Sequence, residues 1–175
     1  ATGAQPDVIP GMEPDGETIL DYSHAIMLEA LPESAVIIGG GAIGVEFATI
    51  WSGFGVQVDL VEMLPHLLPN EEDDAAAELT KAMGKRGVKV HAGTKVKSVT
   101  KNESGTEVVL EGEKGEERVQ AAVTLVAVGF RPNSANLGLE ALGVATDRRG
   151  FVQVDERMAT NVPGIWAIGD LTGKL

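Results

Sequence analysis

The chain has 175 residues, of which 43% are hydrophobic, so it carries enough apolar surface for one domain with its own core. Fourteen basic and twenty-six acidic residues give a formal net charge of −12, and no basic patch is visible, so we expect no nucleic-acid partner. The absence of cysteine excludes disulfides and thiol nucleophiles, and no leader or long apolar run occurs, so we expect a soluble piece of a longer chain without a membrane span.

The chain begins with a segment of mixed character. Residues 1–34 contain several prolines, glycines and acids, interrupted by a short helical stretch at 22–31. We interpret them as a connection that leads into the domain. The apolar run at residues 35–38 then predicts a buried strand that ends at a cluster of glycines.

A helix and a second strand follow the glycines. Ile43, Phe47 and Ile50 are spaced by four and three residues, which places them on one helix face. Residues 56–61 are rich in β-branched side chains and predict a second strand, which ends at Glu62. Strand, turn, helix and strand in this order predict a βαβ unit.

The next elements are a helix and a short strand. Asn70 is the predicted N-cap of a helix that runs through Arg86, with acids at 71–74 near its positive end and basic residues in its last turns. Gly87 is a natural stop for this helix. Residues 88–90 then predict a third short strand of the same sheet.

The second half of the chain is predicted to be mainly β-structure. Segments 94–100, 106–111 and 116–120 are separated by glycine-containing turns and predict a small antiparallel meander. The apolar run at 123–128 predicts a parallel strand buried on both faces, and we assign the strand candidates 151–154 and 165–168 to a neighbouring domain. The expected fold class is therefore α/β, a Rossmann-like parallel sheet with helices and a small antiparallel β-meander.

The glycine-rich segment after the first strand is the strongest motif. Gly39 permits a tight turn, Gly41 lets a pyrophosphate approach the backbone, and Gly44 lets the helix pack closely on the strand. Backbone N–H groups and the helix dipole would then hold the phosphates. The alternative is a glycine-rich turn without a ligand. We predict a phosphate-binding turn made of Gly39, Gly40, Gly41, Ala42, Ile43 and Gly44.

Two carboxylates lie near this turn in the sequence. Glu62 ends the second strand, where it can accept hydrogen bonds from the adenosine ribose hydroxyls, unless it is only an exposed strand-end acid. Its charge would repel the 2′-phosphate of NADP by about 1 kcal/mol in water and about 4 kcal/mol at an effective dielectric constant of about 20, so NAD is the expected cofactor. Glu46, which we place on the first turn of the helix, either complements the helix dipole or points toward the ligand.

Four separated motifs make the chain similar to the pyridine nucleotide-disulfide oxidoreductases over nearly its whole length. Residues 1–4 resemble the Ala-Thr-Gly that closes the first FAD-binding stretch, and residues 39–46 resemble the NAD turn. Residues 128–133 resemble the Gly-x-Arg-Pro-Asn return, and residues 160–170 resemble the second FAD motif.

Details within these motifs are most like the dihydrolipoamide dehydrogenase branch of the family. Two segments carry this resemblance. One is the Gly-Val-Glu-Phe-Ala helix that continues to Trp51, and the other is the Val-Glu-Met-Leu-Pro segment at 61–65. Phe130 and Met63 depart from the usual pattern, and neither touches the phosphate turn.

The resemblance also implies where cofactors would bind. It puts the NAD pyrophosphate on the glycine turn, with Val45 in the same stretch, Glu46 near the nicotinamide and Glu62 on the ribose. It puts Val96 beside the adenine and Gly129 near the dinucleotide. The alternative for Val96 is that it is only a core residue of its strand. Along FAD it puts Thr2, Gly3 and Asp170, with Asp170 on the ribityl chain, unless Asp170 is only a turn acid.

The domain organisation follows from the same resemblance. Residues 1–34 would come from an FAD domain, 35–130 would form the NAD-binding domain, and 131–175 would return toward the FAD domain. The redox cysteines would precede this piece and a histidine base would follow it. The three histidines His24, His66 and His91 have neither metal-ligand spacing nor a nucleophile to serve, so we predict no metal site and no catalytic residue here.

The complete protein would be a flavin-dependent dehydrogenase that passes hydride from FADH2 to NAD+, while this piece alone would be inactive. It would form a homodimer, act on lipoyl-bearing proteins of 2-oxoacid dehydrogenase complexes, and reside in the cytoplasm, or in the mitochondrial matrix of a eukaryote. The alternatives are the NAD domain of an NADH oxidase, a mercuric reductase or a soluble transhydrogenase, or a non-catalytic NAD-sensing module.

Overall fold

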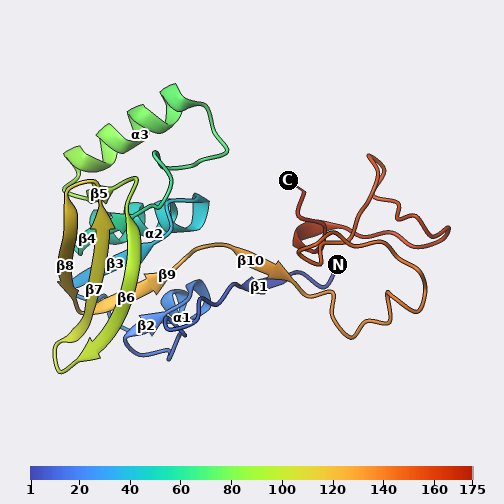
Figure 1. Cartoon of the computed structure of the whole chain (residues 1–175), viewed down its shortest axis with the longest axis horizontal. Helices are drawn as coiled ribbons and strands as arrows, with labels where there is room; N and C mark the ends of the chain where they lie inside the picture. Colours follow the sequence, from blue (N-terminus) through green and yellow to red (C-terminus); the bar gives the residue numbers. More distant parts are fainter. Residues whose placement is uncertain (175) are drawn as a thin grey trace. The chain divides into compact units, whose positions relative to one another are not determined.

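The computed structural model describes residues 1–174 and divides into two compact units (Figure 1). One unit is Val8–Gly129, which we call the sheet unit. The other combines Ala1–Asp7 with the residues from Phe130 onward, and we call it the terminal unit. The sheet unit includes residues 8–34, because a strand and a helix within them pack into its core.

A five-stranded parallel sheet forms the centre of the sheet unit. Its strand order is β2-β9-β3-β4-β5, with every neighbouring pair parallel. The chain moves outward from β3 through β4 to β5 and then returns to β9 on the other side of β3. This reversal makes the carboxyl ends of β3 and β9 the point where doubly wound sheets bind ligands. The strands are β2 (Ile19–Leu20), β3 (Ser34–Ile38), β4 (Gln57–Val61), β5 (Lys89–His91) and β9 (Val123–Val126).

Three helices supply the apolar side chains that cover one face of the sheet. They are α1 (Tyr22–Ile26), α2 (Ala42–Gly53) and α3 (Asp73–Lys85), and each contributes buried residues to one shared core. The helix α1 is shorter than the predicted 22–31 and is capped by the Asp21 side chain. The helix α3 is capped at Glu72, whose backbone is extended, so the predicted cap at Asn70 is wrong by two residues.

The buried face of α2 differs from the predicted one. Gly44, Val45, Ala48 and Trp51 face the core, whereas Ile50 is 51% exposed. Val45, Ala48 and Trp51 form a helical face of their own, and Gly44 on the same face lets the start of the helix approach the turn closely. The core therefore takes this face, and Ile50 is turned outward.

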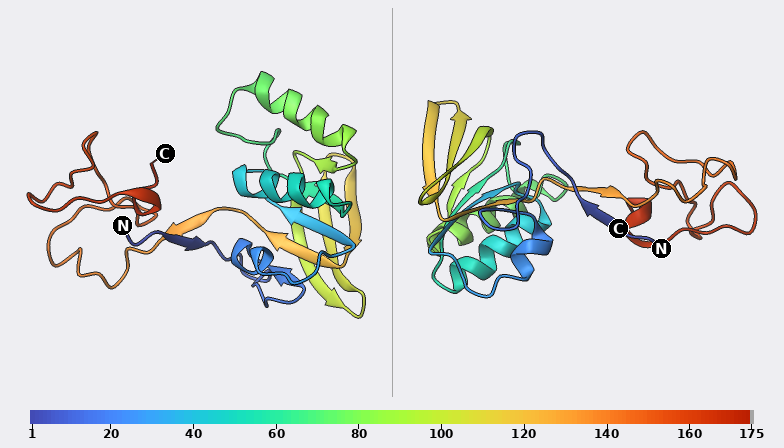
Figure 2. Two further views of the ribbon diagram at one scale, coloured as in Figure 1. Left: turned by 180° about the vertical axis from the view of Figure 1, so that it is seen from behind. Right: turned by 90° about the horizontal axis from the view of Figure 1, so that it is seen from below.

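The predicted antiparallel meander forms, and the structure shows that it covers the opposite face of the sheet (Figure 2). Its strands are β6 (Lys95–Asn102), β7 (Gly105–Gly112) and β8 (Gly115–Ala121). Apolar residues of β6 and β7 share a second core with the sheet. A hydrogen bond of 2.8 Å between the hydroxyls of Thr106 and Thr124, both fully buried, joins the meander to β9. The α/β fold class with a parallel sheet and a meander is confirmed.

The terminal unit has little regular secondary structure. Strand β1 (Ala4–Pro6) pairs with β10 (Phe130–Pro132), and a short 3-10 helix, η1, spans Gly169–Thr172. The predicted strands at 151–154 and 165–168 are wrong, because each makes only an isolated bridge. Their backbone groups bond to loops and to η1, as the Val152 N–H does to the Leu171 carbonyl at 3.0 Å.

Candidate dinucleotide-binding site

Two glycines of the predicted turn are required by the protein itself. Gly39 follows β3 with a φ of 111°, and a Cβ atom there would lie 2.3 Å from the Ala127 carbonyl oxygen, just beyond β9. A Cβ atom on Gly44 would lie 1.9 Å from the Gly39 carbonyl oxygen. Only glycine therefore lets β3, β9 and the start of α2 come this close together. This geometry agrees with a tight turn at Gly39 and a close backbone approach at Gly44, and their part in a cofactor site stays a prediction.

Gly41 is different, because nothing in the protein requires a glycine there. Its φ of −75° and ψ of −174° are open to any residue, and a Cβ atom would meet no atom within 4 Å. The space in front of Gly41 is open, at the first turn of a helix. A pyrophosphate that approaches the backbone would account for the missing side chain.

The start of α2 offers backbone N–H groups to this open space. Gly41 is the N-cap of the helix, and the N–H groups of the first turn, from Gly41 to Gly44, have no acceptor within the helix. Together with the helix dipole they form a site for an anion. Val45 contributes differently, since its N–H donates to the Gly41 carbonyl at 3.0 Å and its side chain is buried in the core.

Glu62 lies directly after β4 and beside the turn, and it is not an exposed acid. Its side chain is 8% exposed, and its two carboxylate oxygens accept the Gly40 N–H and the Leu64 N–H, each at 2.7 Å. Its own N–H donates to the carbonyl of His91, the last residue of β5, and its carbonyl accepts the N–H of Thr94, just before β6. Glu62 thus carries a fixed charge next to the glycine turn, and each carboxylate oxygen keeps further acceptor capacity.

The other predicted residues of the sheet unit lie on three different segments, namely α2, β6 and the loop after β9. Glu46 is exposed on α2 and lies beyond the first helical turn, so its expected place on that turn is wrong. Val96 is half-buried in β6, close to Thr94, whose N–H donates to the Glu62 carbonyl at 2.9 Å. Gly129 follows β9 with a φ of 125°, and a Cβ atom on it would meet no protein atom within 4 Å.

The predicted FAD residues lie in the terminal unit. The Thr2 hydroxyl donates to the Asn133 carbonyl at 2.8 Å, and the Asn133 side chain donates back to the Thr2 carbonyl at 3.0 Å. The Gly3 carbonyl accepts the Asn133 N–H at 2.9 Å. Asp170 is exposed on η1. The motifs at the two ends of the chain therefore belong to one compact unit, separate from the glycine turn.

The sequence analysis did not predict that the loop between β4 and α3 contacts the glycine turn. Leu67 is fully buried against the turn, and the Leu68 N–H donates to the Gly40 carbonyl at 2.8 Å. The sequence signal for this contact is a pair of leucines between two prolines, in a loop that would otherwise be polar.

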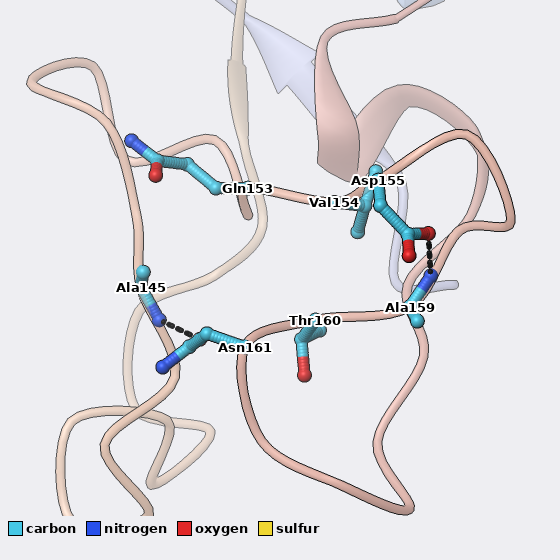
Figure 3. A pocket seen from close by; sticks show the side chains of 7 residues that line it. All are labelled: Ala145, Gln153, Val154, Asp155, Ala159, Thr160 and Asn161. Atoms are coloured by element: carbon cyan, nitrogen blue, oxygen red, sulfur yellow. Dashed lines mark hydrogen bonds between the residues drawn. The ribbon is translucent and has the colours of Figure 1, made fainter.

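Residues 1–174 also contain hollows away from the turn, one at the β6–β7 hairpin and one in the terminal unit. The described residues hold no group of three or more metal-ligating side chains, and none of their helices has the length and apolarity needed to cross a membrane. One hollow of about 350 Å³ lies in the terminal unit (Figure 3). Its polar side chains mainly support the local backbone, as Asn161 does for the Ala145 N–H at 2.8 Å and Asp155 does for the Ala159 N–H at 2.9 Å.

Comparisons with known proteins agree with this geometry. The family model of pyridine nucleotide-disulphide oxidoreductases matches residues 1–175. A dihydrolipoyl dehydrogenase of Chlorobaculum tepidum is 43% identical over 177 residues, which cover 100% of this chain and 37% of that protein. A dihydrolipoyl dehydrogenase of Rhizobium etli is 44% identical over 174 residues, which cover 99% of this chain and 36% of that protein.

Solved structures give the same result. LpdA from Mycobacterium tuberculosis matches with a TM-score of 0.88 at 36% identity, over 99% of this chain and 37% of that one. The HOCl-induced flavoprotein disulfide reductase RclA from Escherichia coli matches with a TM-score of 0.83 at 34% identity, over 100% of this chain and 40% of that one. The chain spans little more than a third of the length of these proteins. It belongs to the pyridine nucleotide-disulphide oxidoreductase family and is similar to its dihydrolipoyl dehydrogenases.

Proposed function

We propose that the sheet unit is the NAD(H)-binding domain of a flavin-dependent dehydrogenase of the dihydrolipoyl dehydrogenase type. The observation that carries this proposal is Gly41, a glycine that the protein does not need but a bound pyrophosphate would. The free N–H groups at the start of α2 and the position of the turn at the reversal of strand order support the same ligand.

The proposal names NAD and not NADP because of Glu62. Its carboxylate is buried and tied to two backbone N–H groups, so it cannot swing away from a 2′-phosphate without leaving both N–H groups unpaired. The ribose hydroxyls of NAD could instead donate to its remaining lone pairs. Repulsion between the two charges amounts to about 4 kcal/mol at an effective dielectric constant of about 20.

Within the complete protein, NAD+ bound here would accept hydride from the reduced flavin. The chain's own residues supply binding, orientation and charge selection, and Glu46 and Gly129 would contact the ligand beyond the turn. Thr2, Gly3 and Asp170 would hold FAD together with segments outside this chain. Lipoyl-bearing proteins as partners and a homodimeric state are part of the same proposal.

Calorimetric titration of the chain with NADH and NADPH tests this function. We expect NADH to bind more tightly, and the preference to shrink in Glu62→Gln, which keeps the shape of the side chain but removes its charge. Glu78→Gln on α3 is the matched control, because it removes the same charge from an exposed site that pairs with Lys81. Equal or tighter binding of NADPH by the unmodified chain would refute the assignment.

A further inference from the structure

The loop between β4 and α3, residues 62–72, holds both polar groups of the Gly40 backbone. Glu62 accepts the Gly40 N–H at 2.7 Å, and the Leu68 N–H donates to the Gly40 carbonyl at 2.8 Å. The Leu67 side chain fills the space beside Gly40, where a Cβ atom would lie 2.6 Å from Leu67 Cδ2. The turn is thus clamped by a segment that is distant in the sequence.

This clamp sets the direction of the Gly41 N–H. The peptide group that joins Gly40 to Gly41 is planar and trans, so its carbonyl and its N–H point in opposite directions. Because the Gly40 carbonyl faces the Leu68 N–H, the Gly41 N–H points away from the loop. The loop therefore orients the first of the unpaired N–H groups at the start of α2.

The backbone of Leu68 is in a strained conformation, of a kind that is often found at functional sites. Its φ of 50° lies in the left-handed region, which leucine seldom adopts. Such conformations persist only where the surroundings enforce them, and they cluster at ligand-binding sites. Here the bond from the Leu68 N–H to Gly40 and the burial of Leu67 enforce it.

We propose that Leu67 and Leu68 are positioning residues for the dinucleotide phosphates. Leu67 anchors the loop in the core, Leu68 fixes the peptide group between Gly40 and Gly41, and that peptide group presents its N–H to the pyrophosphate. This inference rests on the proposed NAD(H) function, and it adds a second segment to the phosphate site.

The same substitution at two buried leucines, Leu67 and Leu60, distinguishes a loss of phosphate positioning from a general loss of stability. Leu67 and Leu60 are both fully buried in the same core, but Leu60 lies within β4, in register with Ile37 of β3 and Val90 of β5. We expect Leu67→Ala to weaken NADH binding about tenfold or more, because the turn loses its support. Leu60→Ala should change the dissociation constant by less than about twofold, since it loosens the core elsewhere. Leu67→Met, which conserves volume, should restore binding.

Hydrogen exchange of the Gly40 and Leu68 amides, followed by NMR, gives a readout that needs no ligand. Both amides should exchange faster in Leu67→Ala than in Leu60→Ala, at a temperature where both variants remain folded. Equal rates, or equal loss of NADH affinity in the two variants, would overturn the proposal. If the unmodified chain does not bind NADH, the proposed function fails and the exchange rates still decide whether the clamp exists. Should Leu67→Ala not fold, Leu67→Val and Leu60→Val make the same comparison.

Discussion

At the scale of single residues, the glycines of the turn are needed for different reasons. Gly39 and Gly44 are needed by the fold, because a side chain at either position would collide with a backbone carbonyl. Gly41 has free space around it and ordinary backbone angles. This contrast allows loss of ligand to be separated from loss of structure within a single turn.

Gly41→Val should abolish NADH binding and leave the fold intact. The branched side chain would occupy the space of the pyrophosphate, while the extended backbone at Gly41 accepts valine. Replacing the N-cap should cost no more than about 1 kcal/mol of the free energy of unfolding. Calorimetric titration and urea unfolding measure the two effects.

Gly44→Val is the counterpart that should damage the fold. Its Cβ would lie 1.9 Å from the Gly39 carbonyl oxygen, so the start of α2 would have to move away from β3. We expect a loss of more than about 3 kcal/mol in the free energy of unfolding. Undiminished NADH affinity in a folded Gly41→Val variant would show that the ligand lies elsewhere.

At the scale of elements, Asp15 ties the segment before β2 to the meander. Its carboxylate accepts the N–H groups of Glu17, Thr18 and Ile19 at 2.8 to 2.9 Å and forms an ion pair with Lys101 on β6. Burial alone would raise the pKa of Asp15, but the Lys101 ammonium and these N–H groups outweigh it and hold the pKa well below its ordinary value of 3.8. The ionised form is therefore the one that stabilises the fold.

Asp15→Asn should lower the free energy of unfolding by about 1 to 2 kcal/mol at neutral pH. Because the folded-state pKa is depressed, the contribution is fully present above the ordinary pKa and declines as the pH falls toward the folded-state value. Urea unfolding at pH 7 and pH 3 should show a smaller difference between the two proteins at pH 3. Glu113→Gln, in the exposed turn after β7, serves as the control. A difference that does not change with pH would contradict this account.

At the scale of the whole molecule, the proposed dinucleotide site is not accompanied by groups for thiol chemistry among the described residues. The chain contains no cysteine. Each histidine is engaged locally: His24 with the cap of α1, His66 with the Leu67 carbonyl, and His91 with Asp59 at 2.7 Å. In the described part of the chain, none of the three histidines forms a hydrogen bond with a nucleophilic side chain.

We therefore expect no oxidation of dihydrolipoamide by the 175-residue chain, even with FAD and NAD+ added. Exchange with a dithiol substrate requires a cysteine, and proton removal requires a positioned base. Absorbance at the NADH band follows the reaction, and a protein-free mixture is the blank. Production of NADH above the blank would show that this chain holds catalytic groups of its own.

Local patterns in the sequence were sufficient for much of the fold and for the turn. The apolar run before Gly39, the β-branched segment before Glu62 and the glycine-punctuated meander each predict their element from residues that are close together in the chain. The glycine spacing works for the same reason, because a tight turn and a helix start are local events.

Only the tertiary structure decided which surfaces and partners these elements use. It turned Ile50 outward because Val45, Ala48 and Trp51 fill the core face of α2, and it packed parts of residues 8–34 into the sheet unit. It also joined Glu62 and Leu68 to Gly40, a contact between segments more than twenty residues apart. Periodicity reports which residues avoid water, whereas these contacts depend on how separate elements pack, and no local pattern encodes that packing.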